Sequence, residues 1–104
     1  NHVNPNKAEK HYLKVLELVP DDPMPYINIS NYYLKNTKYK KCVETLEDAL
    51  TKKLKTKELL NNLGIAYLAT KENEKSKAMF LEALEIDPNY KPAADNLENL
   101  KNIV

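Results

Sequence analysis

Apolar and small residues recur three and four positions apart in short segments of the chain, as in residues 26–33 and 60–67. This spacing places them on one face of an α-helix. No segment alternates apolar and polar residues as a half-buried strand does, and no Asn-Gly hairpin turn occurs. The pattern predicts an all-α chain with six helices, at about 5–19, 23–36, 38–53, 57–70, 74–86 and 90–103.

Residues typical of helix starts stand before most of these segments. Asn4 and Asp22 are each followed by proline, which combines an N-cap side chain with the residue preferred in the first helical turn. Thr37, Thr56 and Asn73 precede three further segments and are predicted to cap them.

The chain also repeats itself with a period of 34 residues. An offset of 34 aligns residues of similar size: Tyr26 with Leu60, Ile29 with Leu63, Ser30 with Gly64, Tyr33 with Tyr67, Cys42 with Ser76, Leu46 with Phe80, and Ala49 with Ala83. Carried backwards, the same offset places Ala8 on Cys42 and Tyr12 on Leu46. A fixed period of this length is typical of stacked helical repeats.

Segment 57–90 contains the order Leu-x2-Leu-Gly-x2-Tyr, then Ser-x3-Phe-x2-Ala, and then proline. This order resembles the tetratricopeptide repeat (TPR). The residues that carry the resemblance are Leu60, Leu63, Gly64, Tyr67, Ser76, Phe80, Ala83 and Pro88. Segment 23–56 matches more loosely, with Ser30 in the glycine place and Leu54 in the proline place.

The resemblance implies one TPR domain over residues 1–104, built as an antiparallel helix-hairpin solenoid with a right-handed superhelical twist. It divides the chain into a half repeat at 1–22, repeats at 23–56 and 57–90, and a C-terminal capping helix at 91–104. Because the chain begins with a half repeat and not with methionine, we expect it to be a piece of a longer protein.

Stacking supplies the core of such a fold, because a single helix pair cannot bury its apolar face alone. A residue as small as Gly64 lets the two helices of a pair approach closely. At the first helix, Tyr12 and Leu16 lack a preceding helix and are predicted to form an exposed apolar strip. At the last helix, Glu98 and Lys101 stand in the glycine and tyrosine places, which predicts a face turned to solvent.

Composition narrows the function classes. The chain has 104 residues, with 16 lysines, no arginine and a formal net charge of +1. A dedicated nucleic-acid binder usually carries a basic excess, so nucleic acid is not an expected partner. No apolar run of about 18 residues occurs, so no direct membrane insertion is expected from this segment. The compartment stays open: the cytoplasm is favoured, with an extracytoplasmic or membrane-anchored parent as the alternative.

Few residues are candidates for catalysis, metal binding or phosphate binding. Cys42 falls in a small, buried place of its helix, which favours a structural cysteine over a nucleophile. His2 and His11 lack the spacing of a zinc pair. The lone glycine, Gly64, excludes a glycine-rich phosphate loop. We therefore expect no catalytic residues, no cofactor and no metal site.

The resemblance implies a non-catalytic protein–protein interaction module, a scaffold or adaptor for complex assembly. In TPR arrays the first helix of each pair lines a concave groove that binds an extended peptide or a partner helix. The side chains expected in that groove are Met24, Ile27, Asn28, Asn31, Asn61, Asn62, Ile65, Asn96 and Asn99.

Three of these residues, Asn28, Asn62 and Asn96, recur at the 34-residue period. An Asn side chain both donates and accepts, so a row of them can bind the backbone of an extended peptide. The row resembles the asparagine ladder of some peptide-binding TPR arrays, including that of O-GlcNAc transferase. The alternative is that asparagine is merely abundant here, with 13 in the chain.

A second comparison within the family concerns the co-chaperones, whose groove holds the C-terminal carboxylate of a chaperone with lysine, asparagine and arginine. Asn31 and Asn62 occupy the two asparagine places. Ile27, Pro92 and Asn96 occupy the cationic places, so a carboxylate finds no charge partner. A carboxylate ligand is therefore disfavoured, and a neutral, extended segment stays open as a ligand.

Two alternatives remain open from the sequence. The segment could be structural, associating with a second copy or with further repeats through the helix at 5–19. An acidic or phosphate-bearing partner could instead bind the lysine cluster at the turn between the helices at 23–36 and 38–53. Its residues are Lys35, Lys38, Lys40 and Lys41, with Tyr39.

Overall fold

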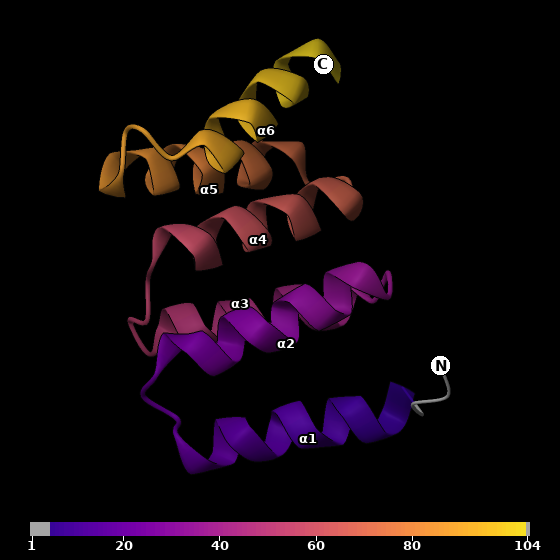
Figure 1. Ribbon diagram of the computed structural model, residues 1–104. Helices are drawn as coiled ribbons and strands as arrows, with labels where there is room; N and C mark the ends of the chain where they lie inside the picture. Colours follow the sequence, from indigo (N-terminus) through magenta and orange to yellow (C-terminus); the bar gives the residue numbers. More distant parts are fainter. Residues whose placement is uncertain (1–4, 104) are drawn as a thin grey trace.

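The computed structural model describes residues 5–103, with side chains placed from 7 to 102. Over this range all regular secondary structure is α-helix, and the helices stack from α1 at one end to α6 at the other (Figure 1). The helices are α1 (Pro5–Leu18), α2 (Pro23–Lys35), α3 (Tyr39–Thr51), α4 (Lys57–Ala69), α5 (Asn73–Ile86) and α6 (Lys91–Ile103). All six predicted helices are confirmed, and the all-α stack of helix pairs is confirmed with them.

Two helix starts form as predicted. The Asp22 carboxylate accepts a hydrogen bond from the Met24 backbone N–H at 3.0 Å, immediately before α2. The Thr56 hydroxyl accepts one from the Leu59 backbone N–H at 3.1 Å, before α4. Each bond satisfies a backbone donor that the first helical turn leaves without a partner.

Two other predicted caps are wrong. Thr37 lies in the turn before α3 with φ of 56°, and its hydroxyl donates to the Asn36 carbonyl. The residue that caps α3 is Lys38, whose side chain makes no capping bond. Asn73 is already the first residue of α5. The predicted cap at Asn4 lies outside the described residues.

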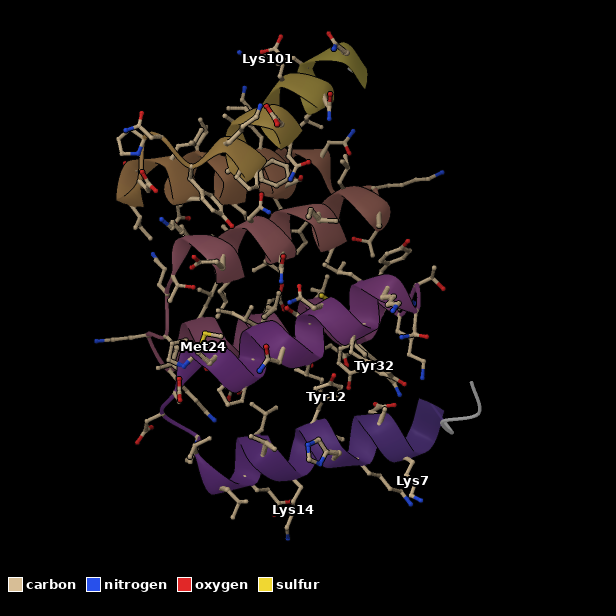
Figure 2. The ribbon with its side chains drawn as sticks, viewed as in Figure 1. Lys7, Tyr12, Lys14, Met24, Tyr32 and Lys101 are labelled. Carbon is tan, nitrogen blue, oxygen red and sulfur yellow. The ribbon has the colours of Figure 1, made fainter. Side chains whose placement is uncertain are left out.

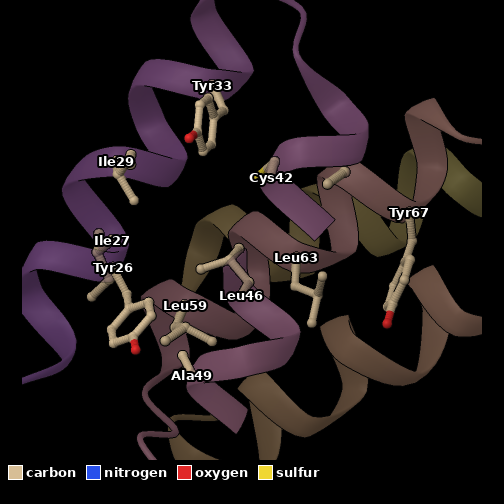
Figure 3. Close-up of a cluster of buried hydrophobic side chains, with 11 residues drawn as sticks. Tyr26, Ile27, Ile29, Tyr33, Cys42, Leu46, Ala49, Leu59, Leu63 and Tyr67 are labelled. Atoms are coloured by element: carbon tan, nitrogen blue, oxygen red, sulfur yellow. The ribbon is translucent and has the colours of Figure 1, made fainter. Parts of the chain in front are cut away.

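The core lies between consecutive helices of the stack. Figure 3 shows one cluster in which side chains of α2, α3 and α4 meet. Its members are Tyr26, Ile27, Ile29, Tyr33, Cys42, Leu46, Ala49, Leu59, Leu63, Ala66 and Tyr67. A second cluster joins α4, α5 and α6 through Leu60, Phe80, Ala83, Ala93 and Leu100. The apolar side chains of each helix pair are therefore buried against the neighbouring pairs, as a stacked array requires.

Small residues set the distance between paired helices. A Cβ on Gly64 would lie 2.5 Å from Phe80 Cε1, so only glycine fits between α4 and the ring. In the same pair, the Ser76 hydroxyl donates to the Gly64 carbonyl at 2.7 Å. The equivalent contact 34 residues earlier joins the Cys42 thiol to the Ser30 carbonyl at 3.9 Å.

The two ends of the stack differ. On α1, Tyr12 and Leu16 are half-buried and pack against the core cluster next to α2, so the predicted apolar strip is only partly exposed at these two residues. The exposed apolar residues of α1 include Leu13 and Leu18. At the other end, the polar residues of α6 that were predicted to face solvent are exposed.

Candidate peptide-binding groove

One face of the stack is built by α2, α4 and α6. Helix α2 contacts α4, α4 contacts α6, and the three lie on the near side in Figure 2. Most side chains expected in the groove reach this surface. Met24, Asn28, Asn31 and Asn99 are exposed, and Asn62, Ile65 and Asn96 are half-buried. We call this surface, with its five asparagines 28, 31, 62, 96 and 99, the asparagine face.

One hydrogen-bonded contact on this face joins α4 to α2. The Asn62 Nδ2 donates to the Ser30 hydroxyl at 2.8 Å and to the Asn31 Oδ1 at 2.9 Å. The Ser30 hydroxyl in turn donates to the Ile27 carbonyl at 2.8 Å. Both amide hydrogens of Asn62 are thus used between helices, and its Oδ1 is left as an acceptor. Asn31 has the opposite arrangement, because its oxygen accepts and its amide hydrogens remain available.

A second contact of the same kind joins α6 to α4. The Asn96 Nδ2 donates to the Asn61 Oδ1 at 3.0 Å. Asn61 is only 6% exposed, so it supports Asn96 from below and does not line the surface as predicted. The predicted row of asparagines therefore includes ties between successive helices, a role that the sequence pattern alone did not indicate.

Ile27 also departs from its predicted place. It is 7% exposed and belongs to the core cluster instead of the groove surface. The reason is physical: the apolar stripe of α2 is wide enough to include residue 27, and burying an isoleucine side chain contributes about 1.5–3 kcal/mol.

Asn28 occupies a different setting from its two periodic counterparts. It lines a hollow of about 420 Å³ between α1 and α2, together with Tyr12, Asn31, Tyr32 and Lys35. The sequence predicts Tyr12 in an exposed strip of the first helix but does not place it beside Asn28. It also misses Tyr32, which stands four residues after Asn28 and so shares its helix face.

Positive charges at the turn between α2 and α3 are partly neutralised by Glu9 of α1. The Glu9 carboxylate accepts a hydrogen bond from Lys41 at 3.0 Å and from the Tyr33 hydroxyl at 2.8 Å, and it pairs with Lys38 at 3.5 Å. The bond from Lys41 is the largest cause of the lowered pKa of Glu9. Two lysines of the predicted cluster are therefore engaged in holding α1 against α2 and α3.

The few reactive residues lie in structural settings. Cys42 is fully buried, and burial raises the pKa of its thiol to about 12. His11 is exposed and contacts the Tyr12 ring edge-on, whereas His2 lies outside the described residues. Across the described residues, no group of three or more His, Cys, Asp or Glu side chains could hold a metal ion. In the same range, no helix is long and apolar enough to cross a membrane.

Comparison with known proteins agrees with this helical-repeat architecture. The tetratricopeptide repeat family model matches residues 57–90. The chain has the TPR fold. Two similar solved structures are TPR domains, each with 20% sequence identity and a TM-score of 0.86. One is the first TPR of Spaghetti (RPAP3) bound to the HSP90 peptide SRMEEVD; the match covers 95% of this chain and 79% of that one. The other is the Arabidopsis OM64 TPR domain, with 96% and 83% covered. A search of curated proteins found no match.

In this fold, α2, α4 and α6 share one face of the stack. The matched segment 57–90 contains α4 and α5, including the Gly64–Ser76 contact. Its polar surface residue Asn62 reaches α2, outside the matched segment. The candidate groove therefore depends on the stacking of helix pairs and not on one repeat alone.

Proposed function

We propose that the chain is a protein-interaction module that binds an extended, uncharged peptide segment on the asparagine face. The observation that carries this proposal is the pairing of Asn31 with Asn62. The contact between them fixes both amides, so that Asn62 presents an oxygen and Asn31 presents N–H groups side by side. A peptide backbone offers the complementary pair, an N–H and a C=O, at every residue.

The character of the surrounding surface supports an uncharged ligand. Ile27 is buried, and Pro92 and Asn96 carry no positive charge, so none of the three places that are cationic in carboxylate-binding TPR domains holds a cation here. Met24 and Ile65 add apolar surface to the same face. The RPAP3 domain binds a peptide that ends in an acidic residue. A ligand of this chain would lie in the same kind of groove but would contact uncharged side chains instead of cations.

The test begins with selection of ligands from a display library of short peptides that lack charged side chains. The decisive variant is Asn31→Asp. It keeps the oxygen that accepts from Asn62, so the fold should melt as the parent does, but it removes the N–H groups offered to a ligand. Loss of one or two hydrogen bonds predicts about five- to tenfold weaker peptide binding. Asn89→Asp, in the exposed loop before α6, is the matched control and should bind as the parent does.

The peptide SRMEEVD provides a second arm. We expect it to bind more weakly than the selected neutral peptides, because its carboxylates find no cation in the groove. Failure to enrich any peptide, or equal binding by Asn31→Asp and the parent, would contradict the proposed site. Tight binding of SRMEEVD would contradict the uncharged ligand while leaving the interaction role.

A further inference from the structure

The hollow between α1 and α2 is an incomplete helix interface. Ala8, Tyr12 and Val15 form one stripe of α1, and all three are half-buried. The residues 34 and 68 positions later are fully buried in both later helices. They are Cys42, Leu46 and Ala49 on α3, and Ser76, Phe80 and Ala83 on α5. The same stripe is therefore covered twice in the described chain and left open once.

The chain itself shows what covers this stripe. On α5 the cover is α4, through the Gly64–Phe80 contact and the bond from Ser76. On α3 the cover is α2, whose Ser30 carbonyl meets Cys42. In both cases the occupant is a helix with a small residue at the point of closest approach. The described residues provide no such helix over α1.

Asn28 provides an independent observation. Its counterparts Asn62 and Asn96 each reach across to the preceding helix of the asparagine face. Asn28 faces the hollow, and its side chain makes no hydrogen bond within the described residues. Within the described residues, the Asn28 side chain thus has no hydrogen-bond partner and the apolar stripe has no covering helix at the same place.

We propose that this hollow is a docking site for an amphipathic helix that carries glycine opposite Tyr12. The glycine follows from the two complete pairs: Ser30 stands opposite Leu46, but the aromatic ring of Phe80 requires Gly64. Tyr12 is aromatic, like Phe80, and so requires the smaller residue. Figure 2 shows Tyr12 and Tyr32 between α1 and α2, where such a helix would lie.

The neighbouring core cluster and the charge of Lys35 both agree with a docked helix at this place. Tyr12 and Tyr32 already pack against the core cluster, so a docked helix would extend an existing interface. Helices α2 and α4 run in the same direction in Figure 1, and a helix seated in the same way below α2 would place its C-terminus toward Lys35. The C-terminal end of a helix carries partial negative charge, which suits an exposed lysine that has no ion pair in the described chain.

The C-terminal helix of a second copy does not meet this requirement. At the positions of Gly64 and Tyr67, α6 has Glu98 and Lys101, both exposed. A glutamate at the point of closest approach would meet the Tyr12 ring. The occupant is therefore a helix of the α4 type, and the chain's own segment 57–70 is a suitable probe.

The experiment titrates the chain into a fluorescently labelled peptide of residues 57–70 and follows anisotropy. We expect saturable binding, and no binding by the same peptide with Gly64→Leu. In the chain, Val15→Lys places a charge on the docking stripe and should weaken binding by about tenfold or more. Leu18→Lys is the matched control. Leu18 is 70% exposed at the end of the same helix, and its counterpart 34 residues later, Lys52, is exposed beside the covered stripe, so this variant should bind as the parent does.

Three results would overturn the proposal: no saturable binding of the parent peptide, equal binding of the Gly64→Leu peptide, or equal binding by Val15→Lys and the parent. Sedimentation of the chain alone adds a fourth. A dimer that Val15→Lys dissociates would make a second copy the occupant. Because Asn31→Asp tests the asparagine face and Val15→Lys tests the hollow, either proposal can fail while the other stands.

Discussion

At the scale of single residues, Cys42 and Ser76 occupy equivalent positions of two repeats, one with a thiol and the other with a hydroxyl. Both are fully buried, and both approach a carbonyl of the preceding helix, of Ser30 and Gly64 respectively. The shorter contact belongs to the hydroxyl, at 2.7 Å against 3.9 Å for the thiol. The thiol therefore behaves as a small apolar side chain with a weak donor.

The burial of Cys42 predicts a dependence of stability on pH. In the folded chain the pKa of the thiol rises from 9.0 to about 12 because burial disfavours the thiolate. Between these values the unfolded chain releases a proton that the folded chain retains. The free energy of unfolding should then fall as pH rises, by at most about 1.4 kcal/mol per pH unit from this group.

Urea denaturation of the parent and of Cys42→Ser from pH 8 to 10 measures the effect. Serine does not ionise in this range and can bond as Ser76 does, so the fall should be smaller in the variant. Burial also raises the pKa of Tyr33 and Tyr67, which adds a fall common to both proteins at higher pH. Parallel curves for the two proteins between pH 9 and 10 would contradict the assigned burial.

At the scale of helix pairs, the chain contains two solutions to close packing. The α4–α5 pair combines Gly64 with Phe80, and the α2–α3 pair has Ser30 and Leu46 in the same places. A smaller residue on one helix accompanies a larger one on the other. The two positions are therefore expected to be energetically coupled.

A double-mutant cycle tests this coupling. Gly64→Ser should destabilise by about 1–3 kcal/mol, because its Cβ meets the Phe80 ring, although serine is the better helix former. Phe80→Leu alone should destabilise by leaving a cavity. The double variant restores the combination found at Ser30 and Leu46, so it should be more stable than the sum predicts, by about 0.5–3 kcal/mol. Strict additivity in urea denaturation would show that the two places do not share space.

The helices themselves were largely predictable from the sequence. Apolar spacing and the 34-residue period place all six, because both depend on local geometry and on a repeated packing environment. The caps at Asp22 and Thr56 were predictable from residue type. The failure at Thr37 has a specific cause: its residue type suits a cap, but the turn needs φ of 56° at that position.

The candidate site was predictable only as a set of positions. The period places Asn62 and Asn96 on one surface, and both reach it. Which way each amide points depends on the distance between successive helices, which no local pattern specifies. The buried setting of Ile27 and Asn61 has the same origin, since both lie at the boundary between the surface and the packed stripe.

At the scale of the whole molecule, the stack has unlike ends. The α1 end carries an open stripe beside Tyr12, and the α6 end carries charged residues. Between them, ties from Asn62 and Asn96 join α2, α4 and α6 on the asparagine face. The expectation that the periodic asparagines only face a ligand is therefore incomplete, because two of them also hold neighbouring helices together.

The three periodic asparagines consequently allow one residue type to be compared in three settings. Asn62→Ala and Asn96→Ala each remove a tie between helices and should each lower the free energy of unfolding by about 0.5–1.5 kcal/mol. Asn28→Ala removes no bond within the described chain and should change stability by no more than about 0.5 kcal/mol. Urea denaturation of the three single variants makes the comparison. In the presence of the 57–70 peptide the order should change, because a docked helix gives Asn28 the partner that its counterparts already have. Equal losses for all three variants without peptide would show that their stability effect comes from the helices they occupy and not from the ties.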